Sequence, residues 1–320
     1  MNTKVTSSAY RGYLYIACAT FLWGICATLG RAAFTGRLPG VHALQPIDPL
    51  ILSQTRTTFS CWTLLAVVLV RRSWAIIQIS RLDFGRLLLL GILGVAASNY
   101  FYYLAIQRTS VATAIVVQYT APIWVLIYAV ARGQQKPTLQ RVSAVALAVV
   151  GIALVIQILG HGQLKLDKVG LSAALVAALS FAFYNVAGHG VLARLSRWTV
   201  LFYTTLTASL FWILVNPPGK IIAAHYSSAQ WLFLLIFSLL SVLGPFSFYF
   251  AGLQHLEPTR AIVVSCLEPV FSILIAAIAL GETLGLVQTI GIAMVLAAIV
   301  VVQLPEGQSQ PAVAPLEPIE

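Results

Sequence analysis

Apolar runs long enough to cross a bilayer recur along nearly the whole chain. A transmembrane helix needs about 20 predominantly apolar residues, whereas a water-soluble domain carries about 25% charged residues. Of the 320 residues, 59% are hydrophobic and only 9% are charged, so one soluble core could not contain all of these runs. The runs cover residues 12–34, 50–70, 84–106, 109–131, 139–158, 169–190, 199–216, 229–253, 259–280 and 284–304.

The runs are predicted to be helices. They lack the strict alternation of apolar and polar residues that is typical of a membrane β-strand, and a helix pairs its backbone amides within its own segment, as hydrocarbon requires. We therefore expect an all-α integral membrane protein with ten transmembrane helices. The first run is too long for a removable signal peptide and Arg31 interrupts it, so it should be a retained helix. The Pro-rich, acidic segment 305–320 is expected to be a disordered tail.

Basic residues predict the orientation of the chain. With ten helices, both termini lie on the same side of the membrane. Placing them in the cytoplasm puts most of the 19 lysine and arginine residues on that side, mainly through the loops at 71–86 and 132–141. This placement explains the net charge of +10 without a nucleic-acid partner; the partners expected are membrane lipid and a small-molecule substrate.

Two stretches of the sequence repeat each other. Residues 101–122 read FYYLAIQRTSVATAIVVQYTAP, and residues 248–269 read FYFAGLQHLEPTRAIVVSCLEP. Each stretch joins two apolar runs, and the two copies lie five runs apart. Because five is odd, the second copy enters the membrane from the opposite face. We expect two five-helix repeats of inverted topology, at 12–158 and 169–304, as in many secondary transporters.

Both stretches end in a proline within an apolar run, Pro122 in the first copy and Pro269 in the second. Proline inside a helix deprives the carbonyl four residues earlier of its partner; these are the carbonyls of Gln118 and Ser265. An unpaired carbonyl is costly in lipid, so both should face a protein-lined or water-filled cavity. A packing kink relieved by a neighbouring helix is the alternative, but breaks in equivalent runs favour a binding site.

Amide and aromatic side chains are expected to form the walls of that site. Asn99, Tyr100 and Tyr103 can share one face of a helix, and an aromatic wall with a few amide donors suits a solute with an apolar side chain and a polar head. The alternative for the tyrosines is the interfacial aromatic belt. The predicted substrate-binding residues are Trp23, Asn99, Tyr100, Tyr103, Gln118, Tyr184, Asn185, Phe248 and Ser265.

One acidic residue, Glu268, lies well inside an apolar run. A charge at the bilayer centre costs about 2.5–3.5 kcal/mol on insertion scales, so this carboxyl should be protonated, paired or reached by water. It is either a proton-coupling group or a structural partner. Arg56 could pair across helices as a gate or as a strut. The predicted gating or coupling residues are Arg56, Pro122, Glu268 and Pro269.

The chain shows no sign of an enzyme or of a metal protein. It contains no HExxH or GxSxG motif, and its four cysteines lie inside apolar runs without a CxxC pair. We expect no catalytic residue, metal or cofactor. A channel would need a pore ring or rings of charge. A monomer suffices for the expected path, and the sequence leaves the oligomeric state open.

Four features make the chain resemble the drug/metabolite transporter superfamily with paired EamA domains. They are LWG at 22–24, Arg56 early in the second run, CLEPVFSILIAAIALGE at 266–282 and the glycine-led last run from Gly291. The resemblance covers about residues 12–303. It departs at 132–135, where RGQQ stands in place of the usual Gly-Glu.

The resemblance implies a secondary transporter of a bacterial cytoplasmic (inner) membrane that exports small metabolites by alternating access through a central cavity between the repeats. Its aromatic-rich third run is most similar to that of aromatic amino acid exporters, so aromatic or hydrophobic amino acids are the expected substrates. The alternatives are other small metabolites or drugs, or nucleotide sugars, with or without proton antiport.

The fifth and tenth runs are expected to buttress the two repeats and to lie outside the transport path. Small residues four apart allow helices to approach closely, and these runs carry Ala144 and Ala148, and Ala293 and Ala297.

Overall fold

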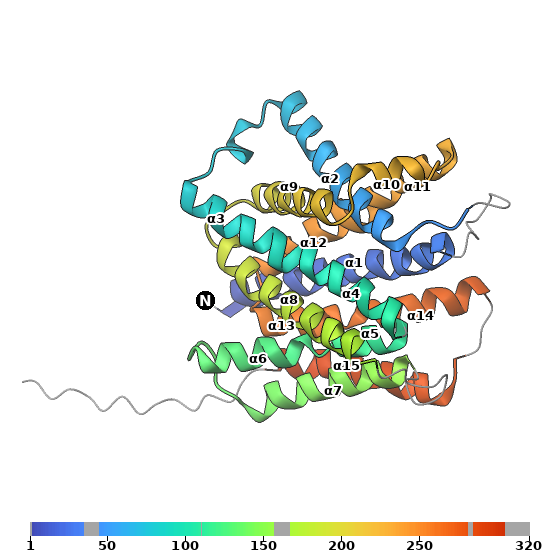
Figure 1. Ribbon diagram of the computed structural model, residues 1–320. Coiled ribbons are helices and arrows are strands. Elements are labelled where there is room, and N and C mark those ends of the chain that lie inside the picture. The colour runs from blue at the N-terminus through green and yellow to red at the C-terminus, as the bar shows by residue number, and fades with distance from the viewer. Residues whose placement is uncertain (1, 35–44, 110, 157–166, 281–283, 305–320) are drawn as a thin grey trace, which may run out of the picture.

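The computed structural model describes residues 2–34, 45–109, 111–156, 167–280 and 284–304 (Figure 1). Over these ranges the chain forms helices and turns and contains no strand. Gly281 and Glu282, which end the stretch 266–282, and the predicted tail 305–320 lie outside the described residues. The helices are α1 (Asn2–Phe34), α2 (Pro49–Arg71), η1 (Trp74–Ile76), α3 (Arg81–Leu89), η2 (Leu90–Ala96), α4 (Ala97–Arg108), α5 (Val111–Gln118), α6 (Ala121–Ala131), α7 (Leu139–Val155), α8 (Lys168–Leu192), α9 (Arg197–Val215), α10 (Pro218–Ala223), α11 (Ser228–Ser238), η3 (Leu239–Leu243), α12 (Gly244–Leu253), α13 (Pro258–Ser265), α14 (Leu267–Leu280) and α15 (Leu286–Gln303).

Seven helical segments in the described part of the chain are long and apolar enough to cross a membrane. The predicted runs at 12–34, 50–70 and 139–158 fall on α1, α2 and α7, which do not belong to this group. The seven are Arg81–Ile106, Thr113–Ala131, Lys168–Leu192, Arg197–Val215, Ser228–Leu253, Pro258–Ile275 and Leu286–Gln303.

The outer surface of the bundle is apolar. Val70 and Leu214 are both 82% exposed, and Ile278 is 84% exposed. A soluble protein rarely leaves large contiguous apolar patches in water. Together with the seven apolar segments, this surface is consistent with a protein that sits in a membrane.

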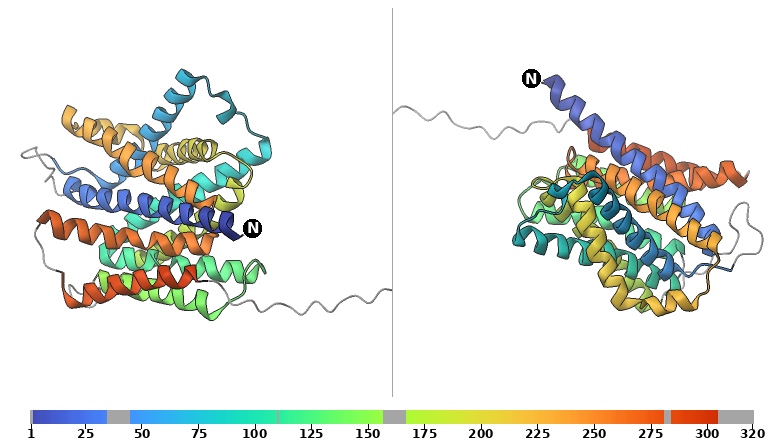
Figure 2. Two further views of the ribbon diagram at one scale, coloured as in Figure 1. Left: turned by 180° about the vertical axis from the view of Figure 1, so that it is seen from behind. Right: turned by 90° about the horizontal axis from the view of Figure 1, so that it is seen from above.

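The last helices of the two predicted repeats, α7 and α15, pack against each other at one edge of the bundle, opposite the edge formed by α2, α9 and α11 (Figures 1 and 2). Gly151 and Gly291 form the closest approach, because a Cβ on Gly291 would lie 2.7 Å from the carbonyl oxygen of Gly151. Small residues therefore do bring these helices together.

The predicted contact face is right on α7 and wrong on α15. Ala144 and Ala148 are fully buried, but Ala293 and Ala297 are exposed. The buried residues of α15 are Gly291, Val295, Ala298 and Val302. The spacing of Ala293 and Ala297 predicted that they would face α7. Instead α15 turns Gly291 toward α7, where the absence of a side chain allows the backbones to approach.

The two hairpins of the repeated stretches lie at opposite ends of α8. Near its beginning, a Cβ on Gly170 would lie 2.8 Å from the Cβ of Arg108, in the α4–α5 turn. Near its end, Nδ1 of His189 lies 2.8 Å from the carbonyl oxygen of Leu253, which precedes the α12–α13 turn. The rise of 1.5 Å per residue places the two contacts about 28 Å apart along the helix axis.

Both predicted proline breaks are present. The first separates α5 from α6 at Tyr119 and Thr120, and it ends two residues before Pro122. The second separates α13 from α14 at Cys266, three residues before Pro269. Each break ends a helical segment four residues before the proline, at Gln118 and at Ser265, whose carbonyls the proline leaves without a helical donor.

Two π-helical segments, η2 and η3, were not predicted. They occupy similar positions in the third and eighth runs, at Leu90–Ala96 and Leu239–Leu243. Pro245 follows η3 and leaves the carbonyl of Ser241 without a helical donor. The indole Nε1 of Trp23 donates to that oxygen at 3.2 Å. Such bulges are frequent at functional sites, and each predicted repeat contains one bulge and one proline break.

Candidate functional site

Side chains from the two proline breaks meet in the interior of the bundle. The hydroxyl of Tyr119, at the first break, is a hydrogen-bonding partner of the Glu268 carboxylate, beside the second break. Tyr119 is buried and Glu268 is half-buried. The contact joins the two predicted repeats at the points where both lose helical regularity.

Arg56 supplies the positive charge nearest this pair. It projects from α2, and its charge acts on Glu268 and on Cys26. One of its terminal nitrogens donates to Oδ1 of Asn99 at 2.6 Å, while Nδ2 of Asn99 donates to the carbonyl oxygen of Val95 at 2.7 Å. The amide of Asn99 is thereby fixed with its oxygen toward the arginine.

A narrow cavity lies beside Arg56, between the two π-helical segments. Val95 of η2 and Val242 of η3 face it from the two predicted repeats, and Phe246 adds an aromatic ring. The other lining residues are Thr57, Leu201, Thr204 and Thr205. Because both threonines of α9 donate to carbonyls of their own helix, the cavity presents few free donors apart from the guanidinium.

A second group of predicted residues gathers on α8 and α12. The side-chain oxygen of Asn185 accepts a hydrogen bond from the hydroxyl of Tyr249, which also contacts the hydroxyl of Ser265. Tyr184 stacks against Tyr249, with ring centroids 6.3 Å apart. Trp23 lies on the other side of Tyr249, 5.3 Å between centroids. Asn185, Tyr184 and Ser265 are thus brought together.

Gln118 bridges toward a different neighbour. Its Nε2 donates to the hydroxyl of Ser98 at 3.4 Å, and Ser98 in turn donates to the carbonyl of Ala177 at 3.4 Å. These contacts connect the first break with α4 and α8. Ser98 directly precedes Asn99, the residue that binds Arg56.

Three predicted residues lie apart from this group. Tyr100 packs against Phe211 and Trp212 of α9, and Phe248 is 37% exposed and stacks on Tyr15. Tyr103 is buried beside Tyr102. Tyr100 and Phe248 contact rings of neighbouring helices, and Tyr103 contacts a ring of its own helix.

Sequence reasoning missed Tyr119 and Tyr249. Both carried a usable signal: Tyr119 stands beside Gln118 in the repeated stretch, and Tyr249 lies four residues after Pro245, on the same helix face. Their rings are buried, whereas the neighbouring Phe248 turns outward. A proline that interrupts a helix fixes the face of the turn that follows it.

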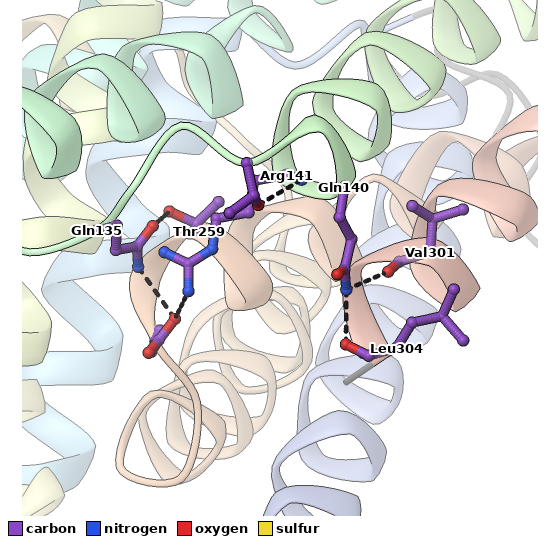
Figure 3. Close-up of polar contacts among 8 residues, drawn as sticks. Gln135, Gln140, Arg141, Thr259, Val301 and Leu304 are labelled. Atoms are coloured by element: carbon purple, nitrogen blue, oxygen red, sulfur yellow. Dashed lines mark hydrogen bonds and ion pairs between the residues drawn. The ribbon is translucent and has the colours of Figure 1, made fainter. Parts of the chain in front are cut away.

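A polar cluster joins the predicted repeats away from the breaks (Figure 3). Oε2 of Glu257, in the α12–α13 turn, lies 3.3 Å from Arg141 of α7 and accepts from Nε2 of Gln135 at 3.1 Å. Thr259 donates to Oε1 of the same glutamine at 2.9 Å. Gln135 belongs to the RGQQ stretch that departs from the family pattern, so its amide binds the other repeat.

A wider cavity of about 550 Å³ lies at the opposite end of α1 from this cluster. A Cβ on Gly12, near the start of α1, would touch Leu256 of the α12–α13 turn, whereas Ala33, at its end, accepts from the amide of Ile47. Ile47, Asp48 and Lys220 are among the residues that line the cavity. Asp48 stands eight residues before Arg56, about 12 Å along the helix axis.

No group of three His, Cys, Asp or Glu side chains that could hold a metal ion occurs among the residues placed by the structure. The four cysteines are free thiols, and Cys26, Cys61 and Cys266 are buried. The site consists of one guanidinium, one carboxyl, amides, hydroxyls and aromatic rings, which suits binding of an organic solute.

Known proteins resemble the chain over most of its length. The uncharacterized inner membrane transporter YicL of Salmonella typhimurium is 22% identical over 300 residues, 93% of this chain and 96% of its own. The threonine/homoserine exporter RhtA of Escherichia coli K12 is 28% identical over 206 residues, 62% of this chain and 65% of its own. A protein of known crystal structure matches with a TM-score of 0.72 at 19% identity, over 93% of this chain and 96% of the other.

The EamA-like transporter family matches two segments of the chain, residues 10–157 and 168–304. Each match covers five of the predicted apolar runs, and together they leave out little more than the termini. The chain therefore belongs to the EamA-like transporter family of the drug/metabolite transporter superfamily.

Proposed function

We propose that this protein is a secondary transporter that exports amino acids from the cytoplasm of a bacterium. The observation that carries the proposal is the meeting of Tyr119 and Glu268 at two interrupted helices in the interior. Interrupted helices near the bilayer midplane form the binding sites of many secondary transporters. A relative that exports threonine and homoserine supports amino acids as the substrate class.

The proposed architecture is ten transmembrane helices in two inverted repeats, 12–158 and 169–304, with both termini in the cytoplasm of an inner membrane. The positions of the α4–α5 and α12–α13 turns at opposite ends of α8 support it. Single cysteines at Arg108 and Gln254 provide the test. Membrane-impermeant labelling of whole cells should reach Arg108→Cys only; labelling of both positions would contradict the inverted arrangement.

Alternating access would rock the two repeats about the interior site. The cytoplasmic end would be closed by the cluster of Gln135, Arg141 and Glu257, while the cavity at Asp48 lies at the other end of α1. Such an arrangement corresponds to a conformation accessible from outside. Transport requires that the cluster separate when the site turns toward the cytoplasm.

Aromatic amino acids are the proposed preference within the class. Phe246 lines the cavity beside Arg56. The ring of Trp23 packs edge-to-face against the ring of Phe246, with centroids 5.2 Å apart. An aromatic substrate side chain could add to this group through offset or edge-to-face contacts. A threonine-like substrate is the second candidate, favoured by the relationship to RhtA.

Counterflow in liposomes tests the function. The purified protein is reconstituted, the liposomes are loaded with one unlabelled solute, and uptake of labelled phenylalanine, threonine or a nucleotide sugar is measured. We expect exchange of the amino acids. An imposed pH gradient separates proton antiport, which it would accelerate, from simple exchange. Protein that is folded in detergent but exchanges none of the solutes would overturn the proposal.

A further inference from the structure

The guanidinium of Arg56 has an unused donor in the interior of the protein. One terminal nitrogen binds Asn99 at 2.6 Å, but Nε is buried and has no acceptor within the described part of the chain. A guanidinium carries five N–H donors in a fixed fork that matches a carboxylate. A buried donor without a partner is costly, so this geometry indicates a missing acceptor.

Glu268 is the complementary group, but it does not form an ion pair with Arg56. The described residues contain two ion pairs, Asp83–Arg86 and Arg141–Glu257. Arg56 and Glu268 are therefore farther apart than the ~4 Å that defines an ion pair, although their charges interact. Opposite charges held inside a protein without direct contact are poorly compensated.

We propose that Arg56 and Glu268 bind the two charged groups of one α-amino acid, and so define the substrate class. The carboxylate of the substrate accepts from Arg56, in place of the acceptor that Nε lacks. The ammonium group donates to Glu268 and to the Tyr119 oxygen beside it. The inference rests on the proposed transport function and deepens it, because it assigns each charged group of the amino acid to a residue.

The residues around the pair favour a zwitterion over other solutes. A nucleotide sugar carries two phosphates, and one arginine beside one carboxylate offers them a net charge near zero. A cationic drug would be repelled by Arg56, and an anionic metabolite by Glu268. Val95 and Phe246 line the cavity next to the guanidinium; it is apolar but measures only about 10 Å³, so it must widen before it can hold an apolar side chain.

Substrates that lack one charged group test the inference with the full-length protein. Liposomes loaded with phenylalanine are offered labelled phenylalanine, phenethylamine, which has no carboxylate, or 3-phenylpropionate, which has no ammonium. A parallel series uses threonine, 1-amino-2-propanol and 3-hydroxybutyrate. Because hydrogen bonds to charged groups are strong, we expect each truncated compound to exchange at least about tenfold more slowly than its parent.

Two variants assign the groups. Arg56→Gln should bring the rates of phenylalanine and phenethylamine close together, and Glu268→Gln should do so for phenylalanine and 3-phenylpropionate. Asp83→Asn and Arg86→Gln, in an exposed ion pair on α3, are matched controls that should keep the wild-type ratios. If the site variants do not fold, the wild-type series alone decides.

The possible results of these experiments distinguish failure of this inference from failure of the proposed transport function. Equal exchange of a parent amino acid and its truncated compounds would overturn the zwitterion site while leaving the transporter in place. If a nucleotide sugar exchanges and neither amino acid does, both the zwitterion site and the amino acid substrate of the proposed function are overturned. Folded wild-type protein that exchanges nothing would overturn the proposed function, and the inference with it.

Discussion

The two interrupted helices have similar backbones and different chemistry. In both, a regular helix ends four residues before a proline and another begins within three residues. The first break presents the phenol of Tyr119, which carries no charge. The second presents the carboxyl of Glu268. The two breaks thus share the geometry that opens the helix but carry unlike groups, which the proposed binding of an asymmetric solute would use.

Removing the carboxyl should have the largest effect. We expect Glu268→Gln to slow amino acid exchange about tenfold to a hundredfold, because hydrogen bonds to a charged group contribute about 1.5–3 kcal/mol. Tyr119→Phe, at the other break, should slow it only a few-fold, since a neutral hydrogen bond contributes about 0.5–1.5 kcal/mol. Initial rates of counterflow measure both. Equal losses would show that the two breaks do not differ in function.

Repairing the breaks should have the next largest effect. Alanine is up to about 3 kcal/mol better than proline inside a helix, so Pro122→Ala and Pro269→Ala should favour a continuous helix and displace Tyr119 or Glu268. We expect slower exchange together with a raised melting temperature, and the greater slowing at Pro269. Pro137→Ala, in an exposed loop, is the control. Unchanged exchange in both variants would mean that the open backbone is not needed.

Adding a methyl group at the contact between α7 and α15 should destabilise the protein equally from either helix. A Cβ on Gly151 would lie 2.9 Å from the oxygen of Gly291, and a Cβ on Gly291 would lie 2.6 Å from the amide of Val155. Overpacking of this kind costs about 1–3 kcal/mol. Thermal unfolding in detergent should show similar destabilisation by Gly151→Ala and Gly291→Ala, and none by Gly190→Ala, whose Cβ would meet nothing within 4 Å.

The smallest effect is expected at the α12–α13 turn. The side chain of Glu257 is 50% exposed, whereas that of Arg141 is 10% exposed. A glutamine at 257 keeps an oxygen that can accept from Arg141, so the change removes only the charge of the solvent-exposed partner, and ion pairs reached by solvent contribute about 0.2–1 kcal/mol. Glu257→Gln should therefore lower the free energy of unfolding by less than about 1 kcal/mol, and the difference should shrink as salt is added. A larger loss of stability at high salt would contradict a solvent-screened contact.

The positions of the apolar helices could be predicted from the sequence, because length and hydropathy are local properties. Every predicted run falls on helix, and Pro122 and Pro269 correctly marked the breaks because proline acts on its own helix. The π-helical segments escaped prediction. No proline marks the bulge of η2 in the sequence. At η3, Pro245 leaves the carbonyl of Ser241 free, and the group that binds this carbonyl is the indole of Trp23 on α1, which is far away in the sequence.

The sequence by itself determined a membrane-embedded helical chain, its internal repeat and the two points at which helices open, since these follow from solvent and from local backbone chemistry. Only the tertiary structure decided which side chains share the interior. It turned Tyr249 inward and Phe248 outward, rotated α15 onto Gly291, and brought Arg56, Tyr119 and Glu268 from three distant segments to one place. The rotation of each helix depends on the shapes of its neighbours, which no single stretch of sequence contains.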